Sequence, residues 1–151
     1  MADAFTLRAC RAEDLAQVHA LLTQLADFTH GVIHTDVPLL EELFRQMEQT
    51  PEIYHNLVAV QAGEVIGFIS IIFYKTLFHT GGTALINELV VDVAWRGAGV
   101  GKALIEATVA EAKRRGMDEV EVGTEQENLS AQKFYHRCGF DEEYVLLSME
   151  F

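Results

Sequence analysis

The pattern of hydrophobic and polar positions at the start of the chain predicts one strand followed by two helices. Residues 5–9 alternate between apolar and polar side chains, as a half-buried strand does. In residues 13–25 and again in residues 38–47, apolar side chains recur three and four positions apart, which is the spacing of an amphipathic helix. Pro51 is expected to end the second helix, and residues 28–36 are expected to form the loop between the two.

The pattern of the remaining chain is that of a sheet with two further helices. Residues 57–60 and 65–74 predict the strands of a hairpin, because a short glycine-containing turn separates them. Residues 84–93 form a third apolar run, and residues 99–115 follow as a helix that Gly116 terminates. A short strand, a short helix and a final strand are expected at residues 120–122, 130–137 and 144–151.

This order of elements predicts a single α/β domain over residues 1–151. The early strands are expected to pair antiparallel. The strand at 84–93, the helix after it and the strand at 120–122 are expected to form a βαβ crossover between parallel strands. A chain of 151 residues has the usual length of one domain, and its 50% hydrophobic content suffices for one core.

The composition narrows the classes of function. A net charge of −12 argues against a nucleic-acid partner, which requires a basic face. It favours a cationic partner, although the same acidity also serves simple solubility. Charged residues interrupt the apolar runs before the length of a membrane span, and the first residues show no secretory signal. We therefore expect a cytoplasmic protein without a membrane segment, in which Cys10 and Cys138 are reduced.

The most informative segment, residues 91–102, joins a strand to a helix through three glycines and two cations. The first amides of a helix have no internal partner and carry the positive end of the helix dipole, so they attract anions. Glycines let this backbone approach a diphosphate, whose charge Arg96 and Lys102 would neutralise. A Walker A loop does not fit, because it requires glycine at Arg96 and a hydroxyl at Ala103. A Rossmann fingerprint fails too, because it requires glycine at Lys102 or Leu104.

The spacing Arg-x-x-Gly-x-Gly, at Arg96, Gly99 and Gly101, resembles the turn of the GCN5-related N-acetyltransferase (GNAT) superfamily. The stretch from Asn128 to Phe140 resembles that family's later Asn-x-x-Ala-x-x-Phe-Tyr-x-x-x-Gly-Phe element. Together the motifs cover about residues 86–140, whereas the first 80 residues fit the family only in their order of strands and helices. The resemblance implies a GNAT-like fold, with a mixed, mostly antiparallel, V-split sheet of six to seven strands and about four helices.

By this resemblance, the chain binds acetyl-coenzyme A as a co-substrate and needs no metal. The backbone of Leu89, Val90 and Val91 is expected to pair with the pantetheine arm in the gap of the split sheet, and Asn128 to contact the same arm. The pyrophosphate would lie on the residues of the turn: Arg96, Gly97, Ala98, Gly99, Val100, Gly101 and Lys102. The alternative is a glycine-rich turn that only joins the strand to the helix.

Acetyl transfer to an amine requires two proton transfers. An ammonium with a pKa of about 10 must lose a proton before its nitrogen attacks, and the departing thiolate should gain one. Tyr135 matches the family tyrosine that protonates or hydrogen-bonds the coenzyme sulfur; its alternative is a half-buried aromatic bonded to the backbone. Glu88 is the candidate base, or else a carboxylate that orients the substrate. Asp92 is the next candidate base, although its position favours capping of the backbone.

The resemblance implies an N-acetyltransferase that moves the acetyl group directly to a primary amine. The acceptor would be a small cation, such as a polyamine or an aminoglycoside, or a peptide amine. Acidic residues that would attract it are Glu41, Glu42, Glu48, Glu125, Glu127, Glu142 and Glu143; each also suits a solvated face. The alternative is a non-catalytic coenzyme-A-binding sensor or interaction module. His30 and His34 lack a third ligand, so no metal site is expected, and a final strand at a sheet edge would favour a homodimer.

Overall fold

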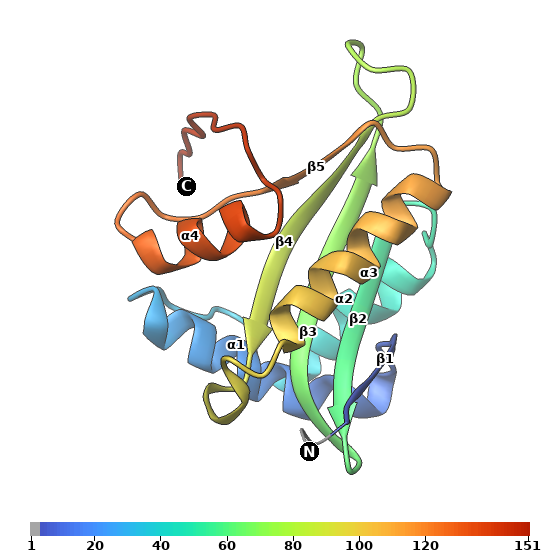
Figure 1. Ribbon diagram of the computed structural model, residues 1–151. Coiled ribbons are helices and arrows are strands. Elements are labelled where there is room, and N and C mark those ends of the chain that lie inside the picture. Colours follow the sequence, from blue (N-terminus) through green and yellow to red (C-terminus); the bar gives the residue numbers. More distant parts are fainter. Residues whose placement is uncertain (1–3) are drawn as a thin grey trace.

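Five strands form one sheet, in the order β1-β2-β3-β4-β5, in the computed structural model, which describes residues 4–151 (Figure 1). The strands are β1 (Thr6–Ala9), β2 (Tyr54–Gln61), β3 (Glu64–Tyr74), β4 (Thr83–Val91) and β5 (Glu119–Val122). The first three pairings are antiparallel, and β5 pairs with β4 in parallel. The α/β fold, the hairpin and the βαβ crossover are therefore as predicted.

Residues 4–151 contain four α-helices: α1 (Leu15–Phe28), α2 (Val37–Glu48), α3 (Val100–Arg114) and α4 (Leu129–Arg137). Figure 1 shows α3 in front of the sheet and α1 and α2 behind it. Short 3-10 helices at Ala12–Asp14 and Val93–Trp95 lead into α1 and into the turn before α3. The four predicted helices are confirmed.

The central strand β3 supplies both halves of the core, which explains its nearly continuous apolar sequence. Ile69 and Ile71 pack with Leu104 of α3 in one buried cluster. Phe68 packs with Val18 of α1 in the other cluster, on the opposite face of the sheet. A strand covered on both faces cannot show the alternation of a half-buried one.

The sheet opens between β4 and β5. Their parallel pairing starts at Thr83, opposite Glu119, and ends at Ile86, opposite Val122. The pairing of β4 with β3 shifts register between Ile86 and Glu88, so Asn87 is an extra residue in β4. From Asn87 to the end of β4, none of the described strands pairs with the side that faces away from β3. The predicted gap is thus present, and a bulge marks where it begins.

The predicted final strand is wrong, and the sheet has five strands instead of six to seven. Residues 144–151 have an apolar, strand-like pattern, but they pair with none of the described strands. An alternating apolar pattern indicates that a segment is suited to a β-strand. It does not indicate whether a sheet edge of the same chain is available for that segment to pair with. None of the helices described within residues 4–151 is long and apolar enough to span a membrane.

Candidate functional site

The turn between β4 and α3 is built on two glycines in the left-handed region. Gly97 has φ of 82° and Gly99 has φ of 86°, conformations that a side chain disfavours. An added Cβ at either position would meet nothing within 4 Å, so both glycines border open space. They are therefore required by the path of the backbone, and they leave room for a ligand to approach it.

The start of α3 is left without a side-chain cap. Asp36 accepts a hydrogen bond from a backbone amide at the start of α2, and Asn128 does so at the start of α4, whereas no side chain caps α3 at Gly99. The first helical bond of α3 runs from the Ala103 amide to the Gly99 carbonyl at 3.0 Å. The preceding amides point out of the helix with the positive end of its dipole, an arrangement that binds anions.

Two cations flank this turn, and each has a neighbour within the chain. The Arg96 guanidinium lies 5.0 Å from the ring centre of Phe28, at the end of α1, which gives the exposed side chain a preferred position. The Lys102 ammonium lies 3.8 Å from Glu106, one turn along α3. An exposed pair of this kind is weak, so Lys102 remains able to contact an anion.

Gly101 brings three elements together. An added Cβ there would lie 3.1 Å from Phe134 of α4 and 3.7 Å from Val91 of β4. The sequence predicted this glycine for the approach of a ligand, but the packing of Phe134 against α3 also requires it. The start of α3, the end of β4 and one face of α4 therefore meet here.

The open side of β4 lies next to this junction. Leu89 and Val91 contact the buried cluster on the α3 side of the sheet, and Val90 points into the cluster on the α1 side. Their backbone pairs with β3 on one side only. The three residues expected to bind the pantetheine arm thus present an unpaired strand edge, at which backbone N–H and C=O groups require partners.

Asn128 begins α4, where its side-chain oxygen accepts a hydrogen bond from the Ala131 amide at 3.1 Å. This capping role was not part of the sequence prediction. It occupies the oxygen and leaves the side-chain NH₂ group as the donor for a ligand.

Tyr135 is half-buried on α4, in an aromatic group. Its ring lies 5.3 Å from that of Phe134 and 5.6 Å from that of Phe140, which it meets edge to face. Burial raises the pKa of Tyr135 to about 12, and the nearby Cys138 thiol adds to this rise. The hydroxyl therefore keeps its proton at neutral pH and is a donor.

Glu88 is half-buried on β4, directly after the bulge residue Asn87. Burial raises its pKa, because the charged form loses solvation. Ser70 faces it across the β3–β4 pairing, and the Ser70 hydroxyl counteracts the rise by hydrogen bonding to the carboxylate. A carboxyl with a raised pKa can accept a proton near neutral pH more readily than an exposed one.

Asp92, the other carboxyl near the turn, has a structural role. It accepts a hydrogen bond from the Ala94 amide at 2.8 Å, and the Gln24 side chain of α1 lies 3.4 Å from its second oxygen. This agrees with the predicted capping of the backbone by Asp92.

The profile of the Acetyltransferase (GNAT) family matches residues 19–140. The chain belongs to this family. GNAT proteins use acetyl-coenzyme A as co-substrate and transfer its acetyl group to amines. The question for this chain is therefore whether the open turn and the unpaired edge of β4 offer the charges and hydrogen-bonding groups that this ligand needs.

Curated and solved relatives agree with this assignment. The chain is 29% identical to the aminoalkylphosphonate N-acetyltransferase of Salmonella typhimurium over 91% of this chain and 86% of that protein. The fold is similar to that of glucosamine-6-phosphate N-acetyltransferase from Arabidopsis thaliana, with a TM-score of 0.83, 22% identity and coverage of 98% and 99% of the two chains. It is also similar to an aminoglycoside acetyltransferase from an uncultured soil metagenomic sample in complex with sisomicin, with a TM-score of 0.78, 21% identity and coverage of 97% and 95%.

The charged and polar groups at this site are of the kinds that acetyl-coenzyme A requires. The uncapped amides and the two cations suit a pyrophosphate, and the unpaired edge of β4 suits the amide groups of a pantetheine arm. Within residues 4–151, no group of three or more His, Cys, Asp and Glu side chains could hold a metal ion.

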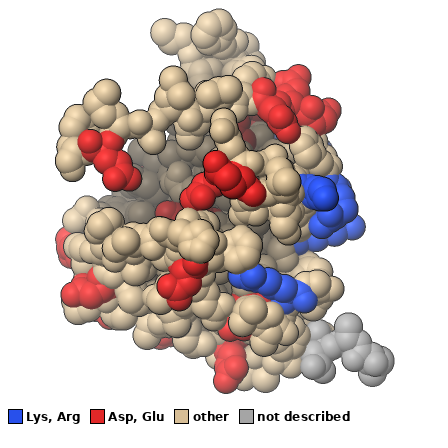
Figure 2. Space-filling model, turned by 90° about the vertical axis from the view of Figure 1, so that its left-hand side faces the viewer, with Lys and Arg blue, Asp and Glu red and all other residues tan. Residues whose placement is uncertain are grey.

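Several acidic residues of the GNAT chain already have partners within the chain, which reduces their attraction for a cationic acceptor. Glu42 pairs with Arg45 at 2.7 Å, Glu143 lies 2.9 Å from His136, and Glu142 accepts the Tyr144 hydroxyl. Figure 2 nevertheless shows a hollow on the side of α4 and the C-terminal segment, with Asp and Glu side chains around it and the visible Lys and Arg side chains to the right.

Sequence analysis missed three contributors to the site. Ser70 was hidden in an apolar strand, and its relation to Glu88 depends on the register of two strands. Asn87 is a bulge, for which the sequence carries no signal. Phe28 was assigned only to a loop boundary. Its aromatic ring nevertheless lies 5.0 Å from the guanidinium of Arg96, 68 positions later in the chain.

Proposed function

We propose that this chain transfers the acetyl group of acetyl-coenzyme A directly to the primary amine of a small cationic molecule, or of a peptide, without an acyl-enzyme intermediate. The observation that carries the proposal is the uncapped start of α3 beside the unpaired edge of β4, with Glu88 upstream on the same strand. Acetyl-coenzyme A supplies the acetyl group as a thioester, which an amine can attack without help from a protein nucleophile.

The chain's backbone holds the co-substrate in this proposal. The backbone of residues 97–102 binds the pyrophosphate, with Arg96 and Lys102 balancing its charge. The Ala98 amide lies 3.3 Å from the Trp95 carbonyl and would have to leave it to take part. Residues 89–91 hydrogen-bond the pantetheine arm as a neighbouring strand would, and Asn128 donates its free NH₂ group to the same arm. Holding both ends of a long ligand fixes the thioester between β4 and α4, which supplies the proximity that the reaction needs.

Glu88 takes the proton from the ammonium form of the acceptor, directly or through a water molecule. Its raised pKa narrows the gap to the pKa of an amine, so the transfer is less uphill than to an ordinary carboxylate. Its position on the bulged part of β4, where the sheet opens, is the reason to prefer it to Asp92.

Tyr135 stabilises the departing sulfur by donating a hydrogen bond. Its pKa of about 12 lies above the value of about 8.5 for an ordinary thiol, so giving the thiolate a complete proton is unfavourable at equilibrium. A hydrogen bond that strengthens as negative charge grows on sulfur requires no complete transfer.

The acceptor is a cation rather than a phosphorylated amine. The names of two relatives specify amines that carry a phosphonate or a phosphate, and such groups require cations beside the acceptor site. Here the hollow in Figure 2 is bordered by carboxylates, and Glu119 and Glu121 lie on β5. A cytoplasmic location belongs to this proposal and stays a prediction.

The test follows thiol release from acetyl-coenzyme A with a panel of polyamines, aminoglycosides, peptide amines and phosphorylated amines. We expect turnover with cationic amines, and a large loss of kcat with little change in coenzyme affinity for Tyr135→Phe. The matched control is Tyr54→Phe, which removes a tyrosine hydroxyl at the start of β2, a strand that does not border the gap between β4 and β5. No turnover with any amine, despite tight coenzyme binding, would favour a non-catalytic sensor, and preferential turnover of phosphorylated amines would contradict the cationic acceptor.

A further inference from the structure

The end of α1 contacts the turn between β4 and α3, although the two segments are far apart in the sequence. The Gln24 side-chain oxygen accepts a hydrogen bond from the Val93 amide, 69 positions later, at 3.1 Å. The Gln24 side-chain nitrogen lies 3.4 Å from the Asp92 carboxylate. One orientation of the amide group serves both contacts, with its oxygen toward an N–H group and its NH₂ group toward a carboxylate. In Figure 1, α1 passes behind the end of β4, next to this turn.

The contacts of Gln24 lie where the turn begins, and a short helix separates that point from the glycines. Asp92 caps the 3-10 helix Val93–Trp95, because its carboxylate accepts a hydrogen bond from the Ala94 amide at 2.8 Å. Its carbonyl accepts another from the Trp95 amide, also at 2.8 Å. Gly97, the first left-handed residue of the turn, follows shortly after this helix. The way in which Asp92 is held therefore helps to set where the amides of the turn point.

Phe28, one helical turn after Gln24, contacts the cation of the same turn. Residues four apart lie on the same face of a helix. The Arg96 guanidinium lies 5.0 Å from the centre of the Phe28 ring. This ring is 50% exposed, so it is not required to fill the core of the protein. Its contact with α1 and with the turn therefore needs another explanation than core packing.

An aromatic ring holds a cation without cancelling its charge. The ring attracts the cation through its quadrupole and carries no net charge itself. Lys102, the other cation of the turn, instead has the Glu106 carboxylate at 3.8 Å, which offsets part of its charge. Arg96 therefore keeps its full positive charge for an anion.

The ring also leaves the hydrogen-bond donors of Arg96 available. A guanidinium carries five N–H donors in its plane, and these form paired hydrogen bonds with phosphate oxygens. Contact with an aromatic face is compatible with such bonds, because it does not use an N–H group for a conventional acceptor. A side chain that is already held in one region loses less conformational entropy when it binds an anion. The contact with Phe28 thus prepares Arg96 for a phosphate instead of competing with it.

We propose that Gln24 and Phe28 of α1 position the turn for the pyrophosphate of coenzyme A, an inference that rests on the proposed function. Gln24 fixes the first residues of the turn and thereby the direction of its amides. Phe28 holds the charge of Arg96 beside these amides. Both are positioning residues, since they act through the turn and need no contact with the ligand. Both also lie outside residues 86–140, the segment that carries the sequence motifs.

The expected losses of affinity are moderate, because each residue acts through another group. Phe28→Leu should weaken coenzyme A binding roughly two- to fivefold, which corresponds to an exposed contact between a cation and a ring. Gln24→Ala should weaken it roughly two- to tenfold, which corresponds to one hydrogen bond. Turnover at saturating acetyl-coenzyme A should stay near the wild-type value, because neither change involves Glu88 or Tyr135.

Isothermal titration calorimetry of the full chain with coenzyme A tests the role of Phe28 through a double-mutant cycle. Phe28→Leu should weaken binding in the wild-type chain but have no further effect in a chain that carries Arg96→Gln. Equal losses in the two backgrounds would show that Phe28 does not act through Arg96, and would contradict the proposal.

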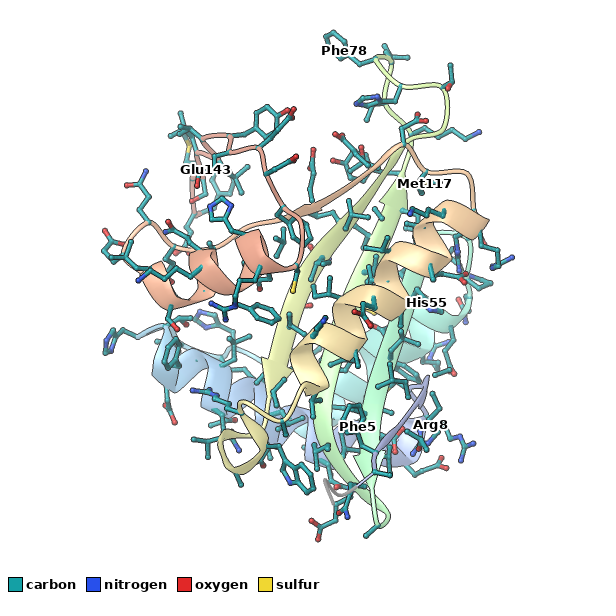
Figure 3. The ribbon with its side chains drawn as sticks, viewed as in Figure 1. Phe5, Arg8, His55, Phe78, Met117 and Glu143 are labelled. Atoms are coloured by element: carbon teal, nitrogen blue, oxygen red, sulfur yellow. The ribbon has the colours of Figure 1, made fainter. Side chains whose placement is uncertain are left out.

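Phe78→Leu is the matched control for Phe28→Leu. Phe78 is 98% exposed, and Figure 3 labels it at the tip of the β3–β4 loop, at the opposite end of β4 from the turn. The same replacement there should leave the affinity for coenzyme A at its wild-type value.

Gln17→Ala is the matched control for Gln24→Ala. Gln17 lies on the same helix and accepts a hydrogen bond from the Val65 amide at 2.8 Å, so it joins α1 to the start of β3. Each replacement removes one bond from a backbone amide to a glutamine of α1, and thermal scans should show similar losses of Tm. Only Gln24→Ala should weaken the binding of coenzyme A.

The outcomes separate this proposal from the proposed function. If the wild-type chain binds coenzyme A and the variants of Gln24 and Phe28 bind it equally tightly, the positioning role alone is wrong. A loss of affinity in Gln17→Ala as large as that in Gln24→Ala contradicts the positioning role too, because the loss would then follow the stability of α1. A wild-type chain that binds no coenzyme A contradicts the proposed function and the positioning role together.

Discussion

Replacing Gly99 by Ala separates the role of the turn in binding from its role in stability. Gly99 has φ of 86°, and an added methyl group would meet no atom within 4 Å. The cost is therefore confined to the backbone and amounts to about 1–2 kcal/mol for a residue with a Cβ in the left-handed region. For a chain of this length, the expected fall in Tm is roughly 2–8 °C.

Binding of coenzyme A should suffer more than stability does. If the turn rearranges to relieve the strain, the amides of Gly99 and its neighbours no longer point at one anion. Losing one hydrogen bond to a charged group costs about 1.5–3 kcal/mol, which corresponds to an affinity roughly ten- to a hundredfold weaker. Isothermal titration calorimetry with coenzyme A measures this loss directly.

Gly116→Ala is the matched control for this experiment. Gly116 lies at the other end of the same helix, has φ of 78°, and also has no atom within 4 Å of an added Cβ. It should lose a similar amount of stability while keeping its affinity for coenzyme A. Equal affinities of the two variants would refute the assignment of the anion site to the start of α3.

Three further outcomes follow from the structure. Ser70→Ala removes the hydrogen bond that lowers the pKa of Glu88, so the acidic limb of the kcat/KM profile should move to higher pH; an unchanged profile would remove Glu88 as the titrating base. Gly101→Ala places a Cβ 3.1 Å from Phe134, and should lower Tm and coenzyme affinity together, which thermal scans with and without ligand would measure. Asp14→Asn weakens the buried pair with Arg8 at 2.7 Å and should reduce the free energy of unfolding in urea at neutral pH. The Arg8 hydrogen bond lowers the pKa of Asp14, so this stability is present above the unfolded pKa of about 3.9 and is lost as pH falls through the lower folded pKa; a variant as stable as wild type at neutral pH would contradict this.

The geometry of the candidate site was predictable where its residues are close in sequence. The three glycines and two cations of residues 91–102 lie in one segment, and local backbone geometry alone predicts an open helix start there. The helices and the hairpin followed equally from their periodicity, because each pattern reflects the face that an element buries.

Features that depend on strand register or on the packing of segments distant in sequence were not predictable. Ser70 faces Glu88 only because β3 and β4 pair with a bulge at Asn87, and a single-residue shift would separate the two. The segment 144–151 has the pattern of a strand, but pairing also requires an edge within reach of the chain. The second role of Gly101 likewise depends on where α4 packs.

The amide NMR signals of residues 97–102, followed as coenzyme A is added, test the central claim most directly. The account predicts that these signals shift most, together with those of residues 89–91, and that inorganic pyrophosphate moves the first group alone. Binding of coenzyme A that leaves the signals of residues 97–102 unchanged would contradict it.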